Sequence, residues 1–336
     1  MLTKKTPTAS SQTPVAAAET VAKEAVAVGG LIAVTGATGF LGQHLLRVLE
    51  QQGHKVRALT RRPQNTGGTV DWVEGDLDTP QALAKLCNGA SVLIHMAGLV
   101  KALDRGIFFD ANVTGTRNIL EAAAVTGVRH VIHVSSLTAR EPRLSHYAAS
   151  KAAAELTVKS NKWPFTATIV RPPAIYGPGD MEILKLLKAG KFGILPAPAS
   201  SRNRFSMIHG EDMARAISFL IDGSHAGEVV EVDDGKPGGY RMSDVAKALA
   251  ACTEKPALVL TIPKFILMFM AAVNGLFARL MQRPTIFTYA KAREISFPDW
   301  TVRASRRPRL KSWQPHYTLS GGLKNTTEWY RQNGFL

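Results

Sequence analysis

The sequence predicts an α/β protein with a doubly wound parallel sheet and a smaller C-terminal region. Apolar runs typical of buried strands alternate with helical patterns over residues 30–175, and the run Leu31–Thr35 leads into a glycine-rich turn, Gly36-Ala-Thr-Gly-Phe-Leu-Gly42. The chain has 336 residues, 45% of them hydrophobic, which is enough to bury such a core. We therefore expect a Rossmann domain over 30–175 and a substrate-binding region over 176–336, with some strands of the latter returning to the sheet.

Residues 1–29 are predicted to form a disordered tail, because they are rich in Ala, Thr, Ser and Pro. A short helix near Ala16–Val26 is the one regular element expected there. The segment has no apolar run long enough for a signal peptide. It also lacks Arg and carries Glu19 and Glu24, which argues against a transit peptide.

Bulk composition narrows the classes of partner. The formal net charge of +15 predicts an anionic partner, which could be a phosphorylated cofactor, a membrane surface or nucleic acid. No nucleic-acid-binding motif accompanies the charge, so we expect no nucleic-acid partner. Cys87 and Cys252 offer neither a disulfide framework nor a metal-ligand cluster, so we expect a cytoplasmic location and no bound metal.

The glycine-rich turn predicts a dinucleotide-binding site. Gly36 allows a turn too tight for a Cβ, Gly39 lets the backbone approach a pyrophosphate, and Gly42 lets the helix start pack close on the strand. The free N–H groups and positive dipole end of the following helix would hold the phosphates. A second strand over Lys55–Thr60 supplies the context that the motif requires. The cofactor contacts expected here are Gly36, Thr38, Gly39, Phe40 and Leu41.

The end of the second strand predicts which cofactor is bound. An NAD enzyme is expected to place a carboxylate there for the ribose 2′-hydroxyl, and that carboxylate would repel a 2′-phosphate. This sequence instead has Thr60-Arg61-Arg62, and a guanidinium group matches phosphate oxygens well. We therefore predict NADP(H), with Arg61 as the first candidate contact and Arg62 as the second. The alternative is a solvated basic turn.

Two further strands, over residues 70–77 and 91–98, are predicted to end beside the cofactor, because ligands of open parallel sheets bind at the carboxyl ends of strands. Small residues at the second of these ends would let a ligand approach the backbone. Asp76 is expected to meet the adenine amino group, whereas His95 is interpreted as a core residue with a hydrogen-bond partner. The expected cofactor contacts are Asp76, Leu77, Ala97 and Gly98.

Five short segments follow the glycine-rich turn in an order typical of one family. They are Gly75-Asp-Leu77, Asn112-Val-Thr-Gly-Thr116, Val134-Ser-Ser136, Tyr147-Ala-Ala-Ser-Lys151 and Arg171-Pro-Pro-Ala-Ile-Tyr-Gly-Pro-Gly-Asp180. The second of these segments is also expected to open a helix that runs to Ala124. With these segments, residues 30–335 resemble the extended short-chain dehydrogenase/reductase family. The resemblance implies an NAD(P)-dependent oxidoreductase in which Pro173, Ala174 and Ile175 meet the nicotinamide carboxamide.

Tyr147 and Lys151 are predicted to carry the chemistry. Four residues apart on a helix they share one face, so the ammonium can lower the tyrosine pKa and bind the ribose hydroxyls. Ser136, at the end of its strand, would hydrogen-bond and polarise the substrate carbonyl. In the reductive direction hydride passes from the nicotinamide to the carbonyl carbon while Tyr147 donates the proton. We therefore predict Ser136, Tyr147 and Lys151 as catalytic residues.

The segment between the active-site serine and tyrosine departs from the family pattern. Sugar-nucleotide epimerases and dehydratases usually carry a longer insertion there that helps to shape the sugar pocket. Here Leu137–His146 is short and leaves a more open mouth beside Tyr147. Such loops carry specificity, so this departure disfavours a nucleotide-sugar substrate.

A second departure is the apolar stretch over residues 257–281. Its continuous part, Phe265–Val273, is shorter than the about 20 apolar residues that span a bilayer, and Asn274 and Arg279 interrupt the rest. Three interpretations are open: a helix buried in the fold or at a dimer interface, an interfacial helix that admits a lipid substrate, and a transmembrane span. The second predicts a peripheral position on the inner face of an anionic membrane. It would be aided by Lys264, Arg279, Arg283, Arg303, Arg306, Arg307, Arg309 and Lys311.

Three classes of function follow. We favour an NADP(H)-dependent reductase of a keto group on a lipophilic substrate, because the chain resembles bacterial family members that reduce 3-oxo sphingolipids such as 3-oxoceramide and, more distantly, the 3β-hydroxysteroid dehydrogenases. The second class is a nucleotide-sugar epimerase or dehydratase. The third is a non-catalytic scaffold resembling the nucleotide-binding accessory subunit of respiratory complex I, against which the three intact catalytic residues argue.

Overall fold

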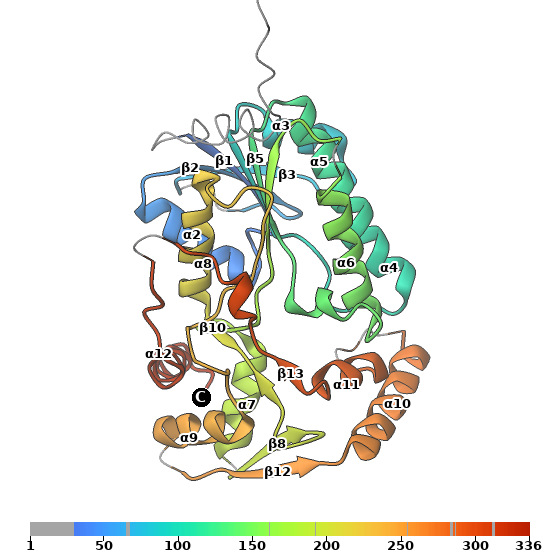
Figure 1. Cartoon of the computed structure of the whole chain (residues 1–336), viewed down its shortest axis with the longest axis vertical. Coiled ribbons are helices and arrows are strands. Elements are labelled where there is room, and N and C mark those ends of the chain that lie inside the picture. Colours follow the sequence, from blue (N-terminus) through green and yellow to red (C-terminus); the bar gives the residue numbers. More distant parts are fainter. Residues whose placement is uncertain are drawn as a thin grey trace, which may run out of the picture.

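The computed structural model describes residues 30–64, 68–160, 162–191, 193–253, 255–282, 285, 287–310 and 313–336. The helix expected near Ala16–Val26 therefore lies outside the described residues, as do Arg283 and Lys311. The described chain forms a layered upper part and a second group of helices and small sheets below it (Figure 1).

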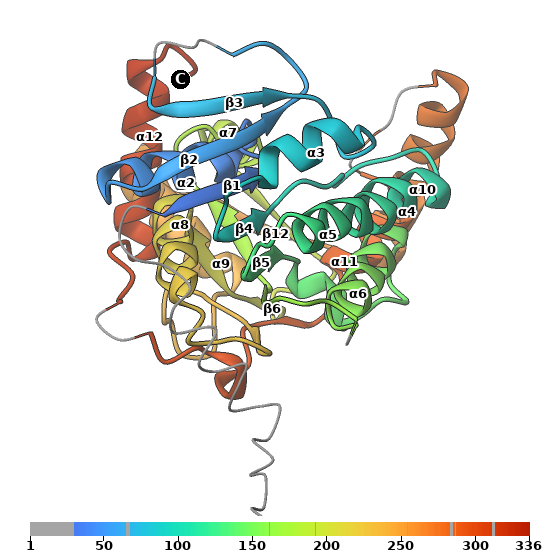
Figure 2. The same ribbon diagram turned by 90° about the horizontal axis from the view of Figure 1, so that it is seen from above.

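A seven-stranded sheet forms the centre of the upper part, in the order β11-β6-β5-β4-β1-β2-β3 (Figure 2). Every pairing in it is parallel. Strand order reverses on either side of β1, which is where open parallel sheets bind ligands. The strands are β1 (Leu31–Thr35), β2 (Lys55–Thr60), β3 (Val70–Glu74), β4 (Val92–His95), β5 (His130–Val134), β6 (Thr166–Val170) and β11 (Val229–Val230).

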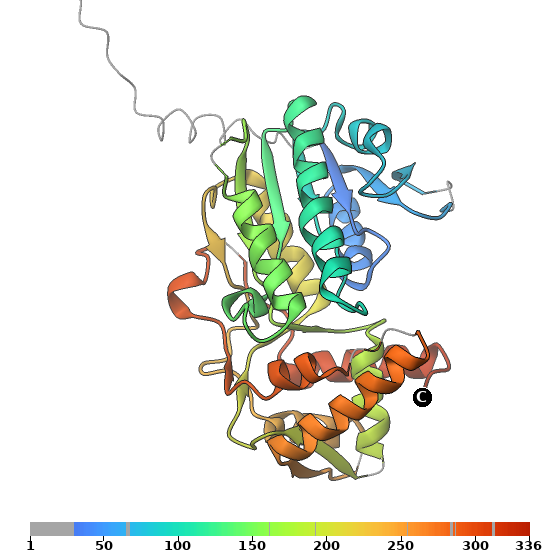
Figure 3. The same cartoon turned by 90° about the vertical axis from the view of Figure 1, so that its right-hand side faces the viewer.

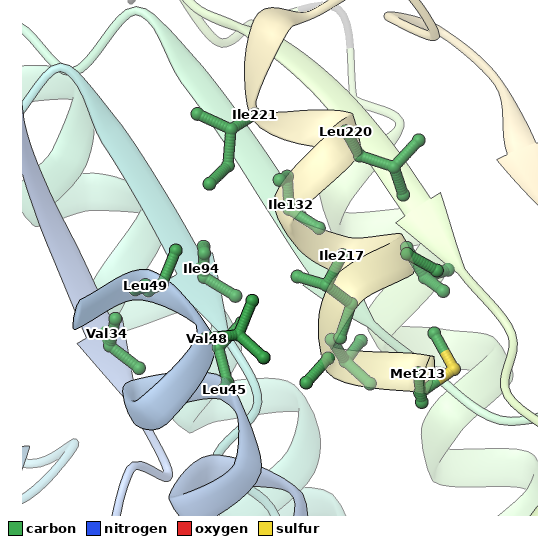
Figure 4. Close-up of a cluster of buried hydrophobic side chains, with 14 of the residues drawn as sticks. Val34, Leu45, Val48, Leu49, Ile94, Ile132, Met213, Ile217, Leu220 and Ile221 are labelled. Atoms are coloured by element: carbon green, nitrogen blue, oxygen red, sulfur yellow. The ribbon is translucent and has the colours of Figure 1, made fainter. Parts of the chain in front are cut away.

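Helices cover both faces of this sheet. Helices α2 (Phe40–Gln51) and α8 (Gly210–Phe219) lie on one face, and α3 (Pro80–Cys87), α5 (Gly115–Val125) and α6 (His146–Val158) lie on the other (Figure 1). The apolar sides of α2 and α8 meet the strands in a core of buried aliphatic side chains (Figure 4). The predicted doubly wound α/β fold is thus confirmed.

The helix expected to open at residues 112–116 begins earlier. It starts with α4 (Arg105–Phe109), whose first turn is capped by Asp104 Oδ1 accepting the Ile107 N–H at 3.0 Å. One π-helical stretch, Asp110–Thr114, then leads into α5. The wider turn holds Asn112 where its amide bonds to both Leu99 backbone groups, at 2.7 and 3.0 Å.

The lower group lies beyond the carboxyl ends of the strands (Figure 1). Its helices are α7 (Met181–Lys191), α9 (Met242–Thr253), α10 (Lys264–Leu280), α11 (Tyr289–Ile295) and α12 (Leu319–Gln332). Three parallel strand pairs join them: β7 (Ala174–Tyr176) with β10 (Met207–His209), β8 (Ile194–Pro198) with β12 (Leu258–Ile262), and β9 (Arg204–Phe205) with β13 (Asp299–Trp300). Short 3₁₀ turns are formed by Leu137–Arg140, Leu220–Asp222 and Ala304–Arg306.

Helix α10 is the apolar stretch singled out in the sequence, and it lies at the edge of the lower group (Figure 3). Leu267 and Ala271 are buried, but Phe265 is 74% and Phe269 is 71% exposed. The interpretation of this stretch as a helix buried in the fold is therefore wrong for most of its length, because α11 covers one side of it only. Of the described helices, none is long and apolar enough to cross a membrane.

Candidate active site

The glycine-rich turn has the geometry that its sequence predicts. Gly36 has φ +76°, and a Cβ there would lie 2.7 Å from the Ala97 nitrogen. At Gly42 a Cβ would lie 2.3 Å from the Gly36 oxygen, so the helix start packs directly on the turn. No described side chain caps α2, which leaves its first N–H groups facing outward from the turn. A phosphate fits this arrangement.

A cavity of about 380 Å³ lies over this turn, at the switch point of the sheet. It is lined by residues of the glycine-rich turn and of the strand ends that were predicted to bind the cofactor, namely Gly36, Thr38, Gly39, Arg61, Asp76, Leu77, Ala97 and Gly98. Phe40, Leu41 and Arg62 are not among its lining residues. Residues that we did not predict also line it, including Met96, Leu99 and Asp78.

Arg61 and Asp76 lie at the adenosine end expected for this cavity. Asp76 Oδ1 accepts the Asp78 N–H at 3.0 Å and the Thr79 hydroxyl at 2.6 Å, and these bonds, with help from Arg61, hold the Asp76 pKa below its usual value. Arg62 differs from Arg61 because its backbone is tied to the Thr60 hydroxyl at 2.7 and 3.2 Å.

Ser136 and Tyr147 come together beyond the end of β5. Ser136 Oγ accepts the Thr138 N–H at 3.2 Å, which starts the 3₁₀ turn of the short loop. Tyr147 occupies the first turn of α6, where Ser145 Oγ caps the helix by accepting the Ala148 N–H at 2.9 Å. The Ser136 and Tyr147 side chains line one cavity, described below.

The pKa of Tyr147 differs from the sequence prediction. We expected Lys151 to lower it, but burial raises it to about 12, and the Ser136 side chain offsets this only in part. Lys151 Nζ instead donates to the Val134 oxygen at 2.9 Å, and burial lowers the pKa of this lysine to about 8. At neutral pH Tyr147 is therefore protonated, and Lys151 is mostly charged.

A buried ion network supports this centre from behind, and the sequence did not reveal it. Glu155, one turn beyond Lys151, accepts from Arg171 at 2.8 and 2.6 Å and from Ser135 Oγ at 2.6 Å. Arg171 reaches Glu231 at 3.6 Å, and Arg140 reaches the same carboxylate at 3.5 Å. The network fixes α6 against the ends of β5 and β6.

A second cavity, of about 590 Å³, contains the reactive side chains and is named the catalytic cavity here. Ser136 and Tyr147 line it, together with the predicted nicotinamide contacts Pro173, Ala174 and Ile175. Its other lining is largely apolar, with Ile183, Leu186, Met207, Met242, Val245, Phe297 and Trp300. Lys291 and Glu294 of α11 also line it. Sequence reasoning missed this pair, because no motif marks α11 and it lies far along the chain from Tyr147.

Two histidines behave as structural residues. His95 is buried and hydrogen-bonds Thr35 at 2.6 Å and Thr116 at 3.0 Å, so its prediction as a core residue is confirmed. His209 is buried against the Tyr317 ring at 3.9 Å between centroids. The adjacent Asp212 accepts the backbone N–H groups of His316 and Tyr317 at 2.8 and 2.9 Å.

Comparisons with known proteins agree with this architecture. Residues 32–232 match the NAD dependent epimerase/dehydratase family. A ceramide reductase of Caulobacter vibrioides is 40% identical over 91% of this chain and 96% of its own. A 2-alkyl-3-oxoalkanoate reductase of Stenotrophomonas maltophilia is 30% identical over 67% of this chain and 76% of its own.

Among solved structures, MoeE5 in complex with UDP-glucuronic acid and NAD is 22% identical, with a TM-score of 0.69 over 91% of this chain and 100% of that one, which supports the fold alone. The family resemblance inferred from the motifs is confirmed by the family match and the reductase relatives. The chain belongs to the NAD dependent epimerase/dehydratase family, within the extended short-chain dehydrogenases/reductases, and is an NAD(P)-dependent oxidoreductase.

Proposed function

We propose that the protein uses NADPH to reduce a keto group on a lipophilic substrate, possible substrates including 3-oxo sphingolipids. The observation that carries this proposal is the placement of Ser136 and Tyr147 in the wall of a largely apolar cavity. The ceramide reductase and the 2-alkyl-3-oxoalkanoate reductase among its relatives act, by their names, on lipophilic compounds.

The protonation state of Tyr147 supports the reductive direction. A tyrosine with a pKa raised to about 12 carries its proton at neutral pH and can donate it to an oxygen that gains negative charge. Ser136 lines the same cavity as Tyr147 and can donate a hydrogen bond to the same oxygen. A bound nicotinamide cofactor would supply the hydride. Lys151, four residues after Tyr147 on α6 and mostly charged at neutral pH, would stabilise the alkoxide as it forms.

The reaction is tested with NADPH and a long-chain ketone presented in detergent micelles. Tyr147→Phe should lose at least roughly a hundredfold in kcat, in the range typical of a lost general acid, while NADPH binding stays within about twofold. A folded Tyr147→Phe protein with full turnover would remove Tyr147 from the mechanism. Product analysis by mass spectrometry should show two added hydrogens, one of them from the deuterated cofactor.

The preference for NADPH rests on Arg61. This residue lines the cofactor cavity beside Asp76, at the carboxyl end of β2, where the ribose of a dinucleotide is expected. A charge-assisted contact of Arg61 with the 2′-phosphate contributes about 1.5–3 kcal/mol, so Arg61→Ala should weaken NADPH binding by roughly 10- to 100-fold and leave NADH binding almost unchanged.

Arg62→Ala is the matched control, since it removes the same charge one residue away from the cavity lining. It should affect both cofactors by less than about threefold. The dissociation constants of NADPH and NADH for the wild-type protein and the two variants, measured by cofactor fluorescence, test this assignment. Tighter binding of NADH than NADPH by the wild-type protein would refute the assignment.

A membrane surface is the proposed source of the substrate. Exposed apolar side chains of α10 would enter the interface, including Phe265, Phe269, Leu276, Phe277 and Leu280. Lys264 begins this helix and could meet an anionic headgroup. The basic segment Arg303–Arg309 is separated from α10 in both Figure 1 and Figure 3, so we do not assign it to the same contact. Arg307 of that segment pairs with Asp233 at 2.8 Å.

Sedimentation with vesicles tests this contact. The wild-type protein should bind anionic vesicles more than neutral ones and be partly released by salt. Phe265→Ser with Phe269→Ser should reduce binding, whereas the control pair Val125→Ser with Leu156→Ser, also exposed but on α5 and α6, should not. No binding at low salt would end the membrane proposal. A concentration-dependent dimer abolished by the α10 changes would instead assign the helix to a homodimer interface.

A nucleotide-sugar epimerase or dehydratase is the second candidate, favoured by the family match. Such an enzyme would return hydride to the same bound cofactor within one turnover. It should therefore retain its dinucleotide on purification and convert a nucleotide sugar without net oxidation of added NADPH. Stoichiometric consumption of NADPH with a lipophilic ketone supports our first candidate instead.

A further inference from the structure

The catalytic cavity does not end at Tyr147. A further cavity of about 570 Å³ begins on the other side of that residue, and we name it the helix cavity because α10 and α11 form one wall of it. The opposite wall comes from residues 100–108 and 142–149, which include the start of α6. Both cavities share four lining residues: Val100, Tyr147, Lys291 and Glu294. In Figure 3 the helix α10 runs below α6.

The wall contributed by α10 consists mostly of small residues. Ala271, Ala272, Gly275 and Ala278 line the cavity together with Leu276, and a Cβ added at Gly275 would meet no atom within 4 Å. Glycine weakens the interior of a helix, so its presence there usually has a reason such as close packing. Here no neighbouring element is close enough to require it. The missing side chain leaves open a volume that is continuous with the catalytic residue.

Polar groups gather at the junction of the two cavities. Glu294 is buried and accepts from Ser145 Oγ at 2.7 Å and from Lys291 Nζ at 3.0 Å. With the Tyr147 hydroxyl, this pair offers hydrogen bonds at the junction. Apolar side chains lie on either side of it, Phe108, Leu144 and Leu276 in the helix cavity and Ile183, Leu186 and Val245 in the catalytic cavity. The lining of the helix cavity also includes the charged residues Lys101, Asp104, Arg143 and Arg293. A polar group of a ligand is thus favoured at the junction, with hydrocarbon to either side.

We propose that the substrate is a two-armed lipophilic ketone, with its carbonyl at Tyr147, one hydrocarbon arm in the catalytic cavity and the other in the helix cavity. This inference rests on the proposed ketone reduction and adds the shape of the substrate to it. Each cavity falls within the about 300–1,000 Å³ range of small-molecule sites, so each can hold an arm. The short loop Leu137–His146 leaves Tyr147 accessible to both cavities.

Two isomeric ketones test the inference. Octadecan-9-one has two long arms, whereas octadecan-2-one has one long arm and a methyl group, and both share one formula. Presented in the same micelles with saturating NADPH, the two-armed isomer should show a kcat/KM at least roughly tenfold higher. Tenfold corresponds to about 1.4 kcal/mol, which about two methylene groups supply when a cavity buries them.

Filling the helix cavity should remove this preference. Gly275→Phe places a ring in the open volume and should lower kcat/KM for the two-armed ketone at least roughly tenfold, while the one-armed ketone changes less than about threefold. Val273→Phe is the matched control, because it adds a ring on the same helix at a residue that lines neither cavity. If circular dichroism shows Gly275→Phe to be unfolded, Gly275→Leu replaces it with the same expectation.

Equal rates on the two isomers, or an equal loss on both in the Gly275 variant, would overturn the two-armed assignment and leave ketone reduction standing. Absence of NADPH oxidation with either ketone and with a short soluble ketone would overturn the proposed function, and this inference with it. The assignment is supported if the wild-type protein and Val273→Phe both prefer the two-armed ketone and the Gly275 variant does not.

Discussion

Removing either partner of the buried ion pair Glu155–Arg171 should destabilise the protein strongly, and removing both should cost less than the sum of the two single changes. The two side chains are joined by two parallel hydrogen bonds of 2.8 and 2.6 Å, and Ser135 adds a third at 2.6 Å. Glu155 is buried, and the Arg171 side chain is 13% exposed. Neither charge can be rehydrated fully when the other is lost.

The magnitude follows from this geometry. Breaking a buried pair by removing one partner costs about 3–5 kcal/mol. Glu155→Gln should fall near the lower end, at about 3 kcal/mol, because the amide oxygen can still accept from Ser135 and because Arg171 keeps Glu231 at 3.6 Å. Arg171→Met should cost at least as much, since it leaves two carboxylates without this guanidinium. The double variant should recover about 2 kcal/mol relative to the sum of the single changes.

Equilibrium unfolding in urea, monitored by tryptophan fluorescence and far-ultraviolet circular dichroism, measures the four free energies of unfolding. Coincident transitions by the two probes establish that the two-state treatment applies. Lys185→Gln, which removes a partner of the exposed pair with Glu182, is the matched control and should cost less than about 1 kcal/mol. Losses below about 1 kcal/mol for the single changes, or strict additivity in the double variant, would refute the reasoning.

Three further predictions concern single residues. Burial lowers the Lys151 pKa from its ordinary 10.5 to about 8, so the charged fraction of this lysine falls as the pH rises through 8. The kcat/KM for reduction should therefore decline above about pH 8. In Lys151→Arg the decline should move to higher pH, because arginine keeps its charge. Asp212→Asn should lower the free energy of unfolding by about 2–3 kcal/mol, as measured by unfolding in urea. The change removes a buried carboxylate, which accepts hydrogen bonds from the backbone N–H groups of His316 and Tyr317 and pairs with Arg215. Gly275→Ala should raise that free energy by about 0.5–1 kcal/mol, since the added methyl group meets no atom within 4 Å and alanine favours the helix; an unchanged or lower value would show that the position is constrained.

Local chemistry explains which parts of the fold could be predicted. The strands Leu31–Thr35 and Lys55–Thr60 were predicted with the bounds that the structure shows, because apolar runs bounded by glycine and by charge mark their own ends. The glycine-rich turn could also be predicted, since the contacts at Gly39 and Gly42 are with Gly36 and Ala37, although the close contact at Gly36 is with the distant Ala97. The early start of the helix at Arg105 was missed, because a short π-helical segment is governed by Asn112 and its bonds to Leu99 rather than by periodicity.

Tertiary environment explains what could not be predicted. The spacing of Tyr147 and Lys151 predicted a lowered tyrosine pKa, but burial of the phenol raises this pKa instead, and burial depends on segments far away in the chain. The exposure of α10 was equally hidden, because an apolar sequence does not show whether a partner covers it. Lys291 and Glu294 reach the site only because α11 folds back beneath α6, and no local pattern marks them.

The charges in the catalytic cavity separate a lipid substrate from a nucleotide sugar. A diphosphate calls for free cationic donors, preferably guanidinium groups that bond two oxygens at once. Among the described residues lining this cavity the cations are Arg204 and Lys291. Arg204 donates to the Gly238 oxygen at 2.9 Å, and Lys291 is paired with the buried Glu294, whose carboxylate would repel a phosphate. A neutral ketone faces no such repulsion, and its hydrocarbon gains free energy from the apolar walls. The charges that line this cavity therefore support the proposed lipophilic substrate over a nucleotide sugar.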